Sequence, residues 1–296
     1  MKSRPIGRGS YFAALLVIFI STYAQYVFPW YNPIAGALFA YCLPILWITR
    51  LCGADIIRRA FANSMAALHY GMGAFGVFAL VGILTATGVF YVISIIDPRA
   101  LNLLHRPIPL LHLPPNVDWM MVWASFLVVG PAEEYIFRGF VFGSMLRLYP
   151  ERHWLLLAFL SSLLFAAAHL YYILIFGIAS LVPLTEIITI GMAMAITYYL
   201  SGGNLIIPAL IHGAFDASGF VAAGISPEIG IALRQSMILA GLIVAFSFLR
   251  RRRGVTTSAP IAPARPTLPK PVPNGCRRPC TIPDVRPSRC NSPLAT

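Results

Sequence analysis

Seven ionisable side chains lie within long apolar stretches of the sequence, where a lipid bilayer would oppose charge. They are Glu133, Glu134, Arg138, His169, Glu186, His212 and Asp216. A charged side chain at the centre of a bilayer costs about 2.5 to 3.5 kcal/mol on insertion scales, so such residues usually face one another inside a bundle. Carboxylates beside imidazoles can take and return protons, which is the work of general acids and bases. The residue types therefore favour a buried catalytic or proton-handling site.

Two pairs of residues spaced four apart indicate separate roles. Glu134 precedes Arg138 in the favourable order for an ion pair on one helix face, which gives Glu134 and Arg138 a structural or orienting role. Glu133 is turned about 100° from Glu134 around the same helix and has no cation four residues ahead, so it is expected to face a pocket as a general base. Asp216 follows His212 at the same spacing and either orients its imidazole or adds a second acceptor.

The elements that position these residues must be membrane helices. Hydrophobic residues make up 58% of the 296-residue chain and charged residues only 11%, against about 25% charged in soluble domains. The predicted fold class is therefore all-α, a polytopic membrane bundle of about eight transmembrane helices. The formal net charge is +12, but the excess Lys and Arg lie at the two ends of the chain, which indicates membrane topology and argues against a nucleic-acid partner.

Eight stretches approach the length of about 20 apolar residues that a spanning helix needs. We place them at residues 11–30, 33–50, 72–96, 119–147, 153–174, 179–200, 204–223 and 230–249. Residues 55–70 are interpreted as an amphipathic segment at the interface. With eight spans both termini share a side, and the Lys and Arg of the short connections predict that this side is cytoplasmic. The first stretch is also consistent with a cleaved signal peptide.

The polar groups lie at similar depths along their predicted helices. Counted from the cytoplasmic helix ends at 1.5 Å per residue, Glu133 lies about 21 Å along its helix, His169 about 25 Å, His212 about 13 Å and Asp216 about 20 Å. These depths agree within a couple of turns, so three helices are expected to surround one buried pocket. Two histidines and a glutamate would also suit a zinc ion with one open position. Glu186 lies nearer the outer end of its span and is left unassigned.

Three short motifs can be read from these residues: Glu133 to Arg138 reads EExxxR, Phe165 to His169 reads FxxxH, and His212 to Asp216 reads HxxxN/D. They resemble the motifs of the CPBP family, which contains the type II CAAX prenyl endopeptidases and their bacterial Abi-like relatives. Their order and their placement on separate spans agree with that family. The resemblance covers roughly residues 115–225.

The resemblance implies an intramembrane endopeptidase that hydrolyses a peptide bond of a membrane-associated or hydrophobic peptide. Glu133 and His169 would activate a water molecule, and His212 with residue 216 would stabilise the oxyanion of the tetrahedral intermediate. Asp216 stands where the eukaryotic CAAX enzymes carry Asn, and an ionised Asp cannot donate a hydrogen bond, so it either stays protonated or holds His212. A glutamate-activated water needs no metal, so no cofactor is expected; the alternative is zinc held by Glu133, His169 and His212.

The same interpretation divides the chain into three parts. Residues 1–114 hold three spans and an outer loop, residues 115–250 form the catalytic core, and residues 251–296 form a basic, Pro-rich cytoplasmic tail that is expected to be disordered. The expected partners are the peptide substrate and the lipid bilayer. The expected location is the cell membrane of a prokaryote.

Two other classes of function fit the same residues. A catalytically idle relative could bind a partner peptide, as a bacteriocin-immunity factor does. A proton-coupled transporter also uses intramembrane Glu, His and Asp, although the sequence has no visible internal repeat of spans. Loss of peptide cleavage on removal of Glu133 separates the enzyme from both alternatives.

Overall fold

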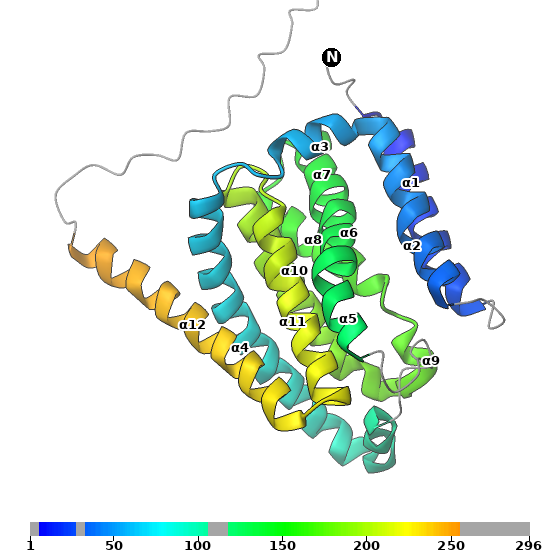
Figure 1. The fold of residues 1–296 in the computed structure, drawn as a ribbon, viewed down its shortest axis with the longest axis vertical. Helices are drawn as coiled ribbons and strands as arrows, with labels where there is room; N and C mark the ends of the chain where they lie inside the picture. The colour runs from blue at the N-terminus through cyan, green and yellow to red at the C-terminus, as the bar shows by residue number, and fades with distance from the viewer. Residues whose placement is uncertain (1–5, 28–32, 106–117, 255–296) are drawn as a thin grey trace, which may run out of the picture. The chain divides into compact units, whose positions relative to one another are not determined.

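The computed structural model describes residues 6–27, 33–105 and 118–254, and every regular element in these ranges is helical. Seven of the described α-helices have fourteen residues or more. They are α1 (Arg8–Val27), α2 (Pro33–Ile48), α4 (Ser64–Ile96), α8 (Trp154–Ala167), α10 (Leu181–Leu200), α11 (Ile206–Gly224) and α12 (Pro227–Gly254). The shorter α-helices are α3 (Ala54–Arg59), α5 (Asp118–Ala124), α6 (Gly130–Glu134), α7 (Gly143–Leu148) and α9 (Tyr172–Phe176). Figure 1 shows α4, α10, α11 and α12 gathered on one side of α6 and the α1–α2 pair on the other. The all-helical prediction is confirmed for the described residues.

Four helical segments are long and apolar enough to cross a bilayer. They are Ser64–Ile96, Trp119–Leu148, Tyr172–Leu200 and Pro227–Arg250. Four shorter apolar helices, within Arg8–Ala24, Phe39–Gly53, Trp154–Ala167 and Ile206–Ala222, make up the rest of this set among the described residues. The chain is therefore a membrane protein. The count of eight spans and the cytoplasmic position of both termini stay predictions, as does the tail beyond Gly254, which lies outside the described residues.

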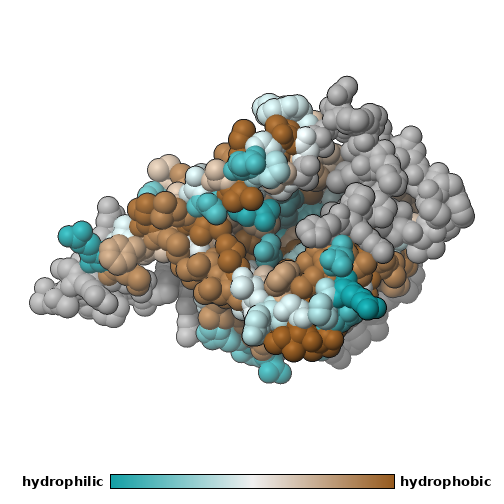
Figure 2. Space-filling view, turned by 90° about the horizontal axis from the view of Figure 1, so that it is seen from below, coloured by the Kyte–Doolittle hydropathy of each residue, from teal (hydrophilic) through white to brown (hydrophobic). Residues whose placement is uncertain are grey.

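The surface of the described helices is largely apolar, as a lipid-facing surface must be. Seen from below the view of Figure 1, brown apolar atoms cover much of the described face (Figure 2). Large side chains on three different segments are well exposed, including Leu84 at 63%, Trp123 at 64% and Phe246 at 67%. Exposed apolar surface on this scale is typical of contact with membrane rather than with water.

The fourth predicted stretch is helical from end to end but not uniformly α-helical. Between α5 and α7 the chain forms two π-helical segments, Ser125–Val129 and Tyr135–Phe142, on either side of the short α6. Segments of π-helix are rare and often mark functional sites, because they shift the direction of the side chains that follow. Here they flank the turn that carries Glu133 and Glu134.

The prediction of one continuous span over residues 153–174 is wrong in its last third. Helix α8 ends at Ala167, and the chain turns before α9 begins at Tyr172. Two side chains accommodate the freed carbonyls: the hydroxyl of Tyr23 donates to the Ala167 oxygen, and the His169 ring bonds the Phe165 oxygen. Side-chain partners of this kind allow a helix to end within a membrane protein without unpaired backbone groups. His169 therefore lies in a turn and not on a helix.

The segment predicted to lie at the interface, residues 55–70, divides between two helices. Most of α3 lies in it, but α4 begins at Ser64, earlier than the expected residue 72. The buried amide of Asn204 donates to the Ala62 oxygen at 2.7 Å and to the Ser64 hydroxyl at 3.2 Å, and the Asn63 amide donates to the Ser201 oxygen at 3.1 Å. These hydrogen bonds connect the start of α4 to the turn that precedes α11. Helix α11 carries His212.

Helices α4 and α12 cross at a contact between two glycines. A Cβ atom added to Gly76 would lie 2.4 Å from the carbonyl carbon of Gly241, and one added to Gly241 would lie 2.7 Å from the Cα of Gly76. Small residues at such a crossing let two backbones approach, which is how membrane helices gain packing energy. Gly88 lies on the same α4 helix with nothing within 4 Å of its missing Cβ.

Replacing Gly76 with alanine is expected to destabilise the protein, because the α12 backbone must move to admit a methyl group. Gly88→Ala adds the same methyl group in open space and should be neutral or slightly stabilising, since alanine is favoured over glycine in helices by about 1 kcal/mol. Thermal unfolding of the two variants in the same detergent measures the difference. Equal melting temperatures would contradict the close crossing.

Candidate functional site

The centre of the site is a buried ion pair joined to a histidine. Arg138 Nη1 lies 3.0 Å from Glu134 Oε1, and both side chains are almost fully buried, as the four-residue spacing predicts. The other guanidinium nitrogen, Nη2, donates to the Gly191 carbonyl of α10 at 3.3 Å. The same Glu134 oxygen lies 2.8 Å from His212 Nδ1 on α11. Because a carboxylate only accepts, this contact places a proton on Nδ1 and fixes the direction of the imidazole.

The second nitrogen of His212 faces two further carboxylates. His212 Nε2 lies 3.6 Å from Glu133 Oε2 and 3.5 Å from Asp216 Oδ2, too far for short hydrogen bonds but close enough for strong electrostatic interaction in a buried site. Three carboxyl groups therefore surround one ring. The ring partner at Nδ1 is Glu134, whereas Asp216, for which the sequence left open an orienting role or that of a second acceptor, lies on the Nε2 side.

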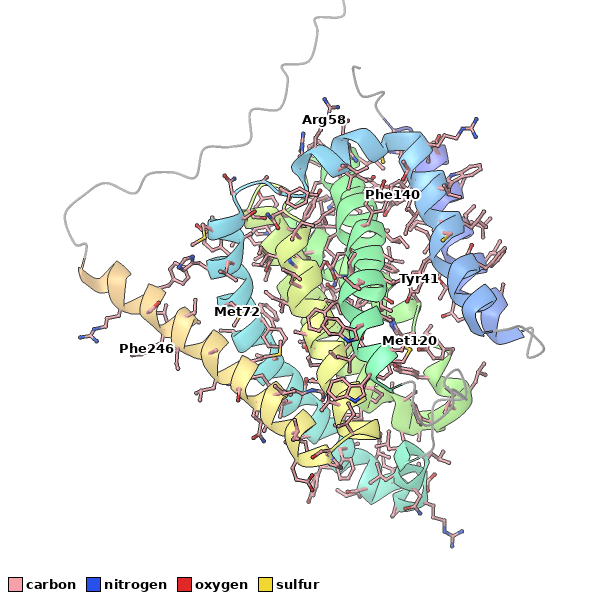
Figure 3. All side chains as sticks on the ribbon, viewed as in Figure 1. Tyr41, Arg58, Met72, Met120, Phe140 and Phe246 are labelled. Atoms are coloured by element: carbon pink, nitrogen blue, oxygen red, sulfur yellow. The ribbon has the colours of Figure 1, made fainter. Side chains whose placement is uncertain are left out.

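Glu133 has a partner that the sequence did not indicate. The hydroxyl of Tyr41, on α2, donates to Glu133 Oε1 at 2.8 Å. Figure 3 labels Tyr41 beside α2. Glu133 itself is only 8% exposed. One carboxylate oxygen is thus held by a phenol and the other lies toward His212. No spacing rule connects residues 92 positions apart, so only the folded chain reveals this contact.

His169 reaches the site from the turn after α8. Its Nδ1 lies 2.9 Å from the Phe165 carbonyl oxygen. A carbonyl only accepts, so the proton is on Nδ1 and the lone pair of the neutral ring is on Nε2. His169 and Glu133 both line a cavity of about 60 Å³, together with Tyr41 and Tyr171. Such a cavity has room for a water molecule with polar partners on several sides.

Phe165, the aromatic residue of the FxxxH motif, contacts three side chains of the cluster. The Phe165 ring centre lies 4.5 Å from the guanidinium carbon of Arg138. Its edge-to-face contacts reach His169, with ring centres 4.9 Å apart, and His212, with centres 5.7 Å apart. One ring therefore supports the buried cation and both histidines at once.

Glu186, which the sequence left unassigned, belongs to a different cluster. Its carboxylate lies 3.9 Å from Arg234 on α12, and both side chains are about one-third exposed. Arg234 also donates to the Ser218 hydroxyl at 3.3 Å and lies over the Phe215 ring at 4.4 Å. Thus the structure brings six of the seven predicted residues together and leaves Glu186 elsewhere.

The three residues named for the zinc alternative do not form a ready metal site. Within the described ranges, no group of three His, Cys, Asp or Glu side chains is placed to hold a metal ion. His212 Nδ1 is engaged by Glu134, and His169 Nδ1 by a backbone carbonyl, which leaves one nitrogen on each ring. A histidine that ligates a metal usually donates its other ring N–H to such an acceptor, so these contacts are compatible with ligation and zinc stays the alternative. No step of the reaction below uses a metal.

Comparison with known proteins agrees with the three motifs. Residues 115–218 match the sequence model of a family described as type II CAAX prenyl endopeptidase Rce1-like. The matched segment contains all three motifs, and helices α1 to α4 lie before it. No curated protein and no solved structure matches the chain.

Proposed function

We propose that this membrane protein is an intramembrane endopeptidase, because residues 115–218 match the Rce1-like family model and carry the three motifs that resemble those of the CPBP family. The observation that carries the proposal is the placement of Glu133 and His169 on one small cavity. A carboxylate and an imidazole around a water-sized space are the components of general-base activation. The family match supports peptidase chemistry over the other uses of intramembrane acids.

The reaction begins with the water. Glu133 accepts a proton from it while the lone pair on His169 Nε2 helps to orient it. The water oxygen then bonds to the peptide carbonyl carbon, and the carbonyl π electrons move onto oxygen. When this tetrahedral intermediate collapses, the C–N bond breaks and Glu133 passes its proton to the leaving nitrogen.

Glu134, Arg138 and Phe165 position these groups without touching the substrate. Glu134 holds His212 by Nδ1, and Arg138 compensates the charge of Glu134. Asp216, 3.5 Å from His212 Nε2, acts on that ring from the opposite side. In this assignment Asp216 holds His212, which is the second of the two roles that its carboxylate allows.

The substrate in this proposal is a membrane-associated or hydrophobic peptide. Ligand pockets usually enclose about 300 to 1,000 Å³, so a cavity of about 60 Å³ holds water but not a peptide. In this proposal the peptide enters beside the cavity by displacement of neighbouring side chains. We place the enzyme in a cell membrane, where such a peptide would approach through the lipid.

A comparison of membrane peptides from cells that carry the wild-type protein or Glu133→Gln tests the function. We expect shortened peptides with new ends only in the wild-type cells, because the variant keeps the fold but lacks the base. Identical peptide populations would instead favour a protein that binds peptides without cutting them. Proton-dependent solute uptake that is lost in the variant would favour the transporter.

Prolonged chelation is expected to leave cleavage by the purified enzyme unchanged, because a glutamate-activated water needs no metal ion. The measurement is kcat before and after dialysis against a strong zinc chelator, with the metal content of the protein determined in parallel. Activity that disappears on dialysis and returns with added zinc would establish the zinc alternative.

A further inference from the structure

The proposed reaction needs a hydrogen-bond donor for the oxyanion, and the motif residues supply it poorly. Asp216 accepts hydrogen bonds when ionised and cannot donate. His212 Nδ1 is taken by Glu134, and Nε2 is directed at two carboxylates. Among the described residues, neither His212 nor Asp216 lines the cavity that holds Glu133 and His169.

Tyr41 offers a donor at the right place. Tyr41 lines the same cavity, and its hydroxyl is directed at the carboxylate that would activate the water, at 2.8 Å from Glu133 Oε1. A phenol is a neutral donor, so it can lie beside a carboxylate without adding a buried charge. It comes from α2, outside the family-matched segment.

The movement of charge during the reaction favours this donor. Before attack, Tyr41 donates to an ionised Glu133. As Glu133 takes the proton of the water, its negative charge passes to the carbonyl oxygen of the substrate, which lies within bonding reach of the same water. The phenol then has a neutral acceptor on one side and a new anion on the other. Donors that meet developing charge in a water-poor site give the largest catalytic effects.

We propose that Tyr41 is a catalytic residue of this enzyme, the donor to the oxyanion of the tetrahedral intermediate. The inference rests on the proposed function and extends it to the N-terminal helix pair. Tyr41 keeps its proton throughout: the water proton goes to Glu133 and then to the leaving nitrogen, while the phenol contributes only a hydrogen bond. The site is therefore built by α2 together with α6, the turn after α8, and α11.

Tyr41→Phe tests the role, because it removes one hydroxyl and keeps the ring. We expect kcat to fall by about 10²- to 10³-fold, the effect of losing one oxyanion donor, with KM nearly unchanged. Tyr199→Phe is the matched control: that ring stacks on Trp154 with centres 4.4 Å apart, away from the cavity, and its loss of a hydroxyl should leave kcat unchanged. Replacement of Tyr41 by 3-fluorotyrosine keeps a hydroxyl and should keep most of the rate.

A transition-state analogue separates catalysis from a structural role. A phosphinate analogue of a cleaved peptide carries the oxyanion, and an N-methylated peptide resembles the ground state. Tyr41→Phe should weaken binding of the phosphinate by the same factor as it lowers kcat/KM. It should leave binding of the N-methylated peptide unchanged. If Tyr41→Phe weakens the binding of both ligands equally, or cleaves at the wild-type rate, the inference is overturned.

The same experiment distinguishes failure of the inference from failure of the function. Wild-type protein and Glu133→Gln are assayed beside Tyr41→Phe. If the wild type cleaves, Glu133→Gln does not, and Tyr41→Phe matches the wild type, only the role of Tyr41 is wrong. If the wild-type protein cleaves no peptide, both proposals fail.

Discussion

Glu133→Gln is expected to lower kcat for peptide cleavage by about 10²- to 10⁴-fold, the usual contribution of a general base. The amide has the size of the carboxylate and still offers an oxygen to the Tyr41 hydroxyl, so the packing of the site is preserved. It cannot accept the proton of the water. The measurement is the steady-state rate on a fluorogenic membrane peptide in detergent or lipid vesicles.

Glu186→Gln is the matched control for this substitution. The same chemical change is made at a carboxylate in the bundle that contacts Arg234 instead of the catalytic cluster. Its rate should equal that of the wild type. A Glu133→Gln enzyme as active as Glu186→Gln would mean that another group activates the water.

Arg138→Met is expected to reduce the free energy of unfolding by about 3 to 5 kcal/mol, because it leaves the carboxylate of Glu134 buried without its cation. Arg138 is 1% exposed and Glu134 is 0% exposed, so water cannot replace the lost partner. The remaining contact with His212 compensates only part of the charge. Unfolding in graded denaturing detergent, or by heat in a mild one, gives the measurement.

The exposed pair between Asp55 and Arg58 provides the comparison. Arg58 is 62% exposed in its side chain, and ion pairs at such positions contribute about 0 to 1 kcal/mol. Arg58→Met should therefore change stability little. The double variant Glu134→Gln with Arg138→Met removes both buried charges and should recover part of the stability lost in Arg138→Met. Equal effects of Arg138→Met and Arg58→Met would contradict the burial argument.

Local spacing in the sequence was sufficient for part of the site. The Glu134–Arg138 pair depends only on helix geometry, and the structure has it at 3.0 Å even though the segment after Glu134 is π-helical. The convergence of three segments followed from the high cost of isolated charges in lipid. The same argument could not tell which charged residues would stay outside the site. Glu186 also lies within an apolar stretch, but it pairs with Arg234 instead.

Contacts between distant segments could not be predicted in this way. Tyr41 and Glu133 are 92 positions apart, and Glu134 and His212 are 78 apart, so no helical periodicity relates them. The end of α8 at Ala167 was also missed, because residues 154–176 contain no proline or glycine that would mark it. The carbonyl of Ala167 is satisfied by Tyr23, a residue of α1, and this partner exists only in the folded chain.

The lengths of the helices could not be predicted from the sequence either. Composition correctly marked the apolar stretches as helices, yet α4 extends over 33 residues and α8 over only 14. At 1.5 Å per residue the latter is about 21 Å long, shorter than the hydrocarbon core of about 30 Å. Hydropathy identifies apolar chain, whereas the ends of each helix depend on tertiary hydrogen bonds such as those of Asn204.

The most direct test of the central claim is hydrolysis of a membrane peptide by the purified protein, in lipid vesicles, in oxygen-18-enriched water. The peptide is one that appears only in shortened form in the wild-type cells. We expect one oxygen-18 atom in the new carboxyl terminus of the product, formed by the wild-type enzyme and absent with Glu133→Gln. Cleavage without incorporated oxygen-18, or the same labelled product from both proteins, would contradict a water activated by Glu133.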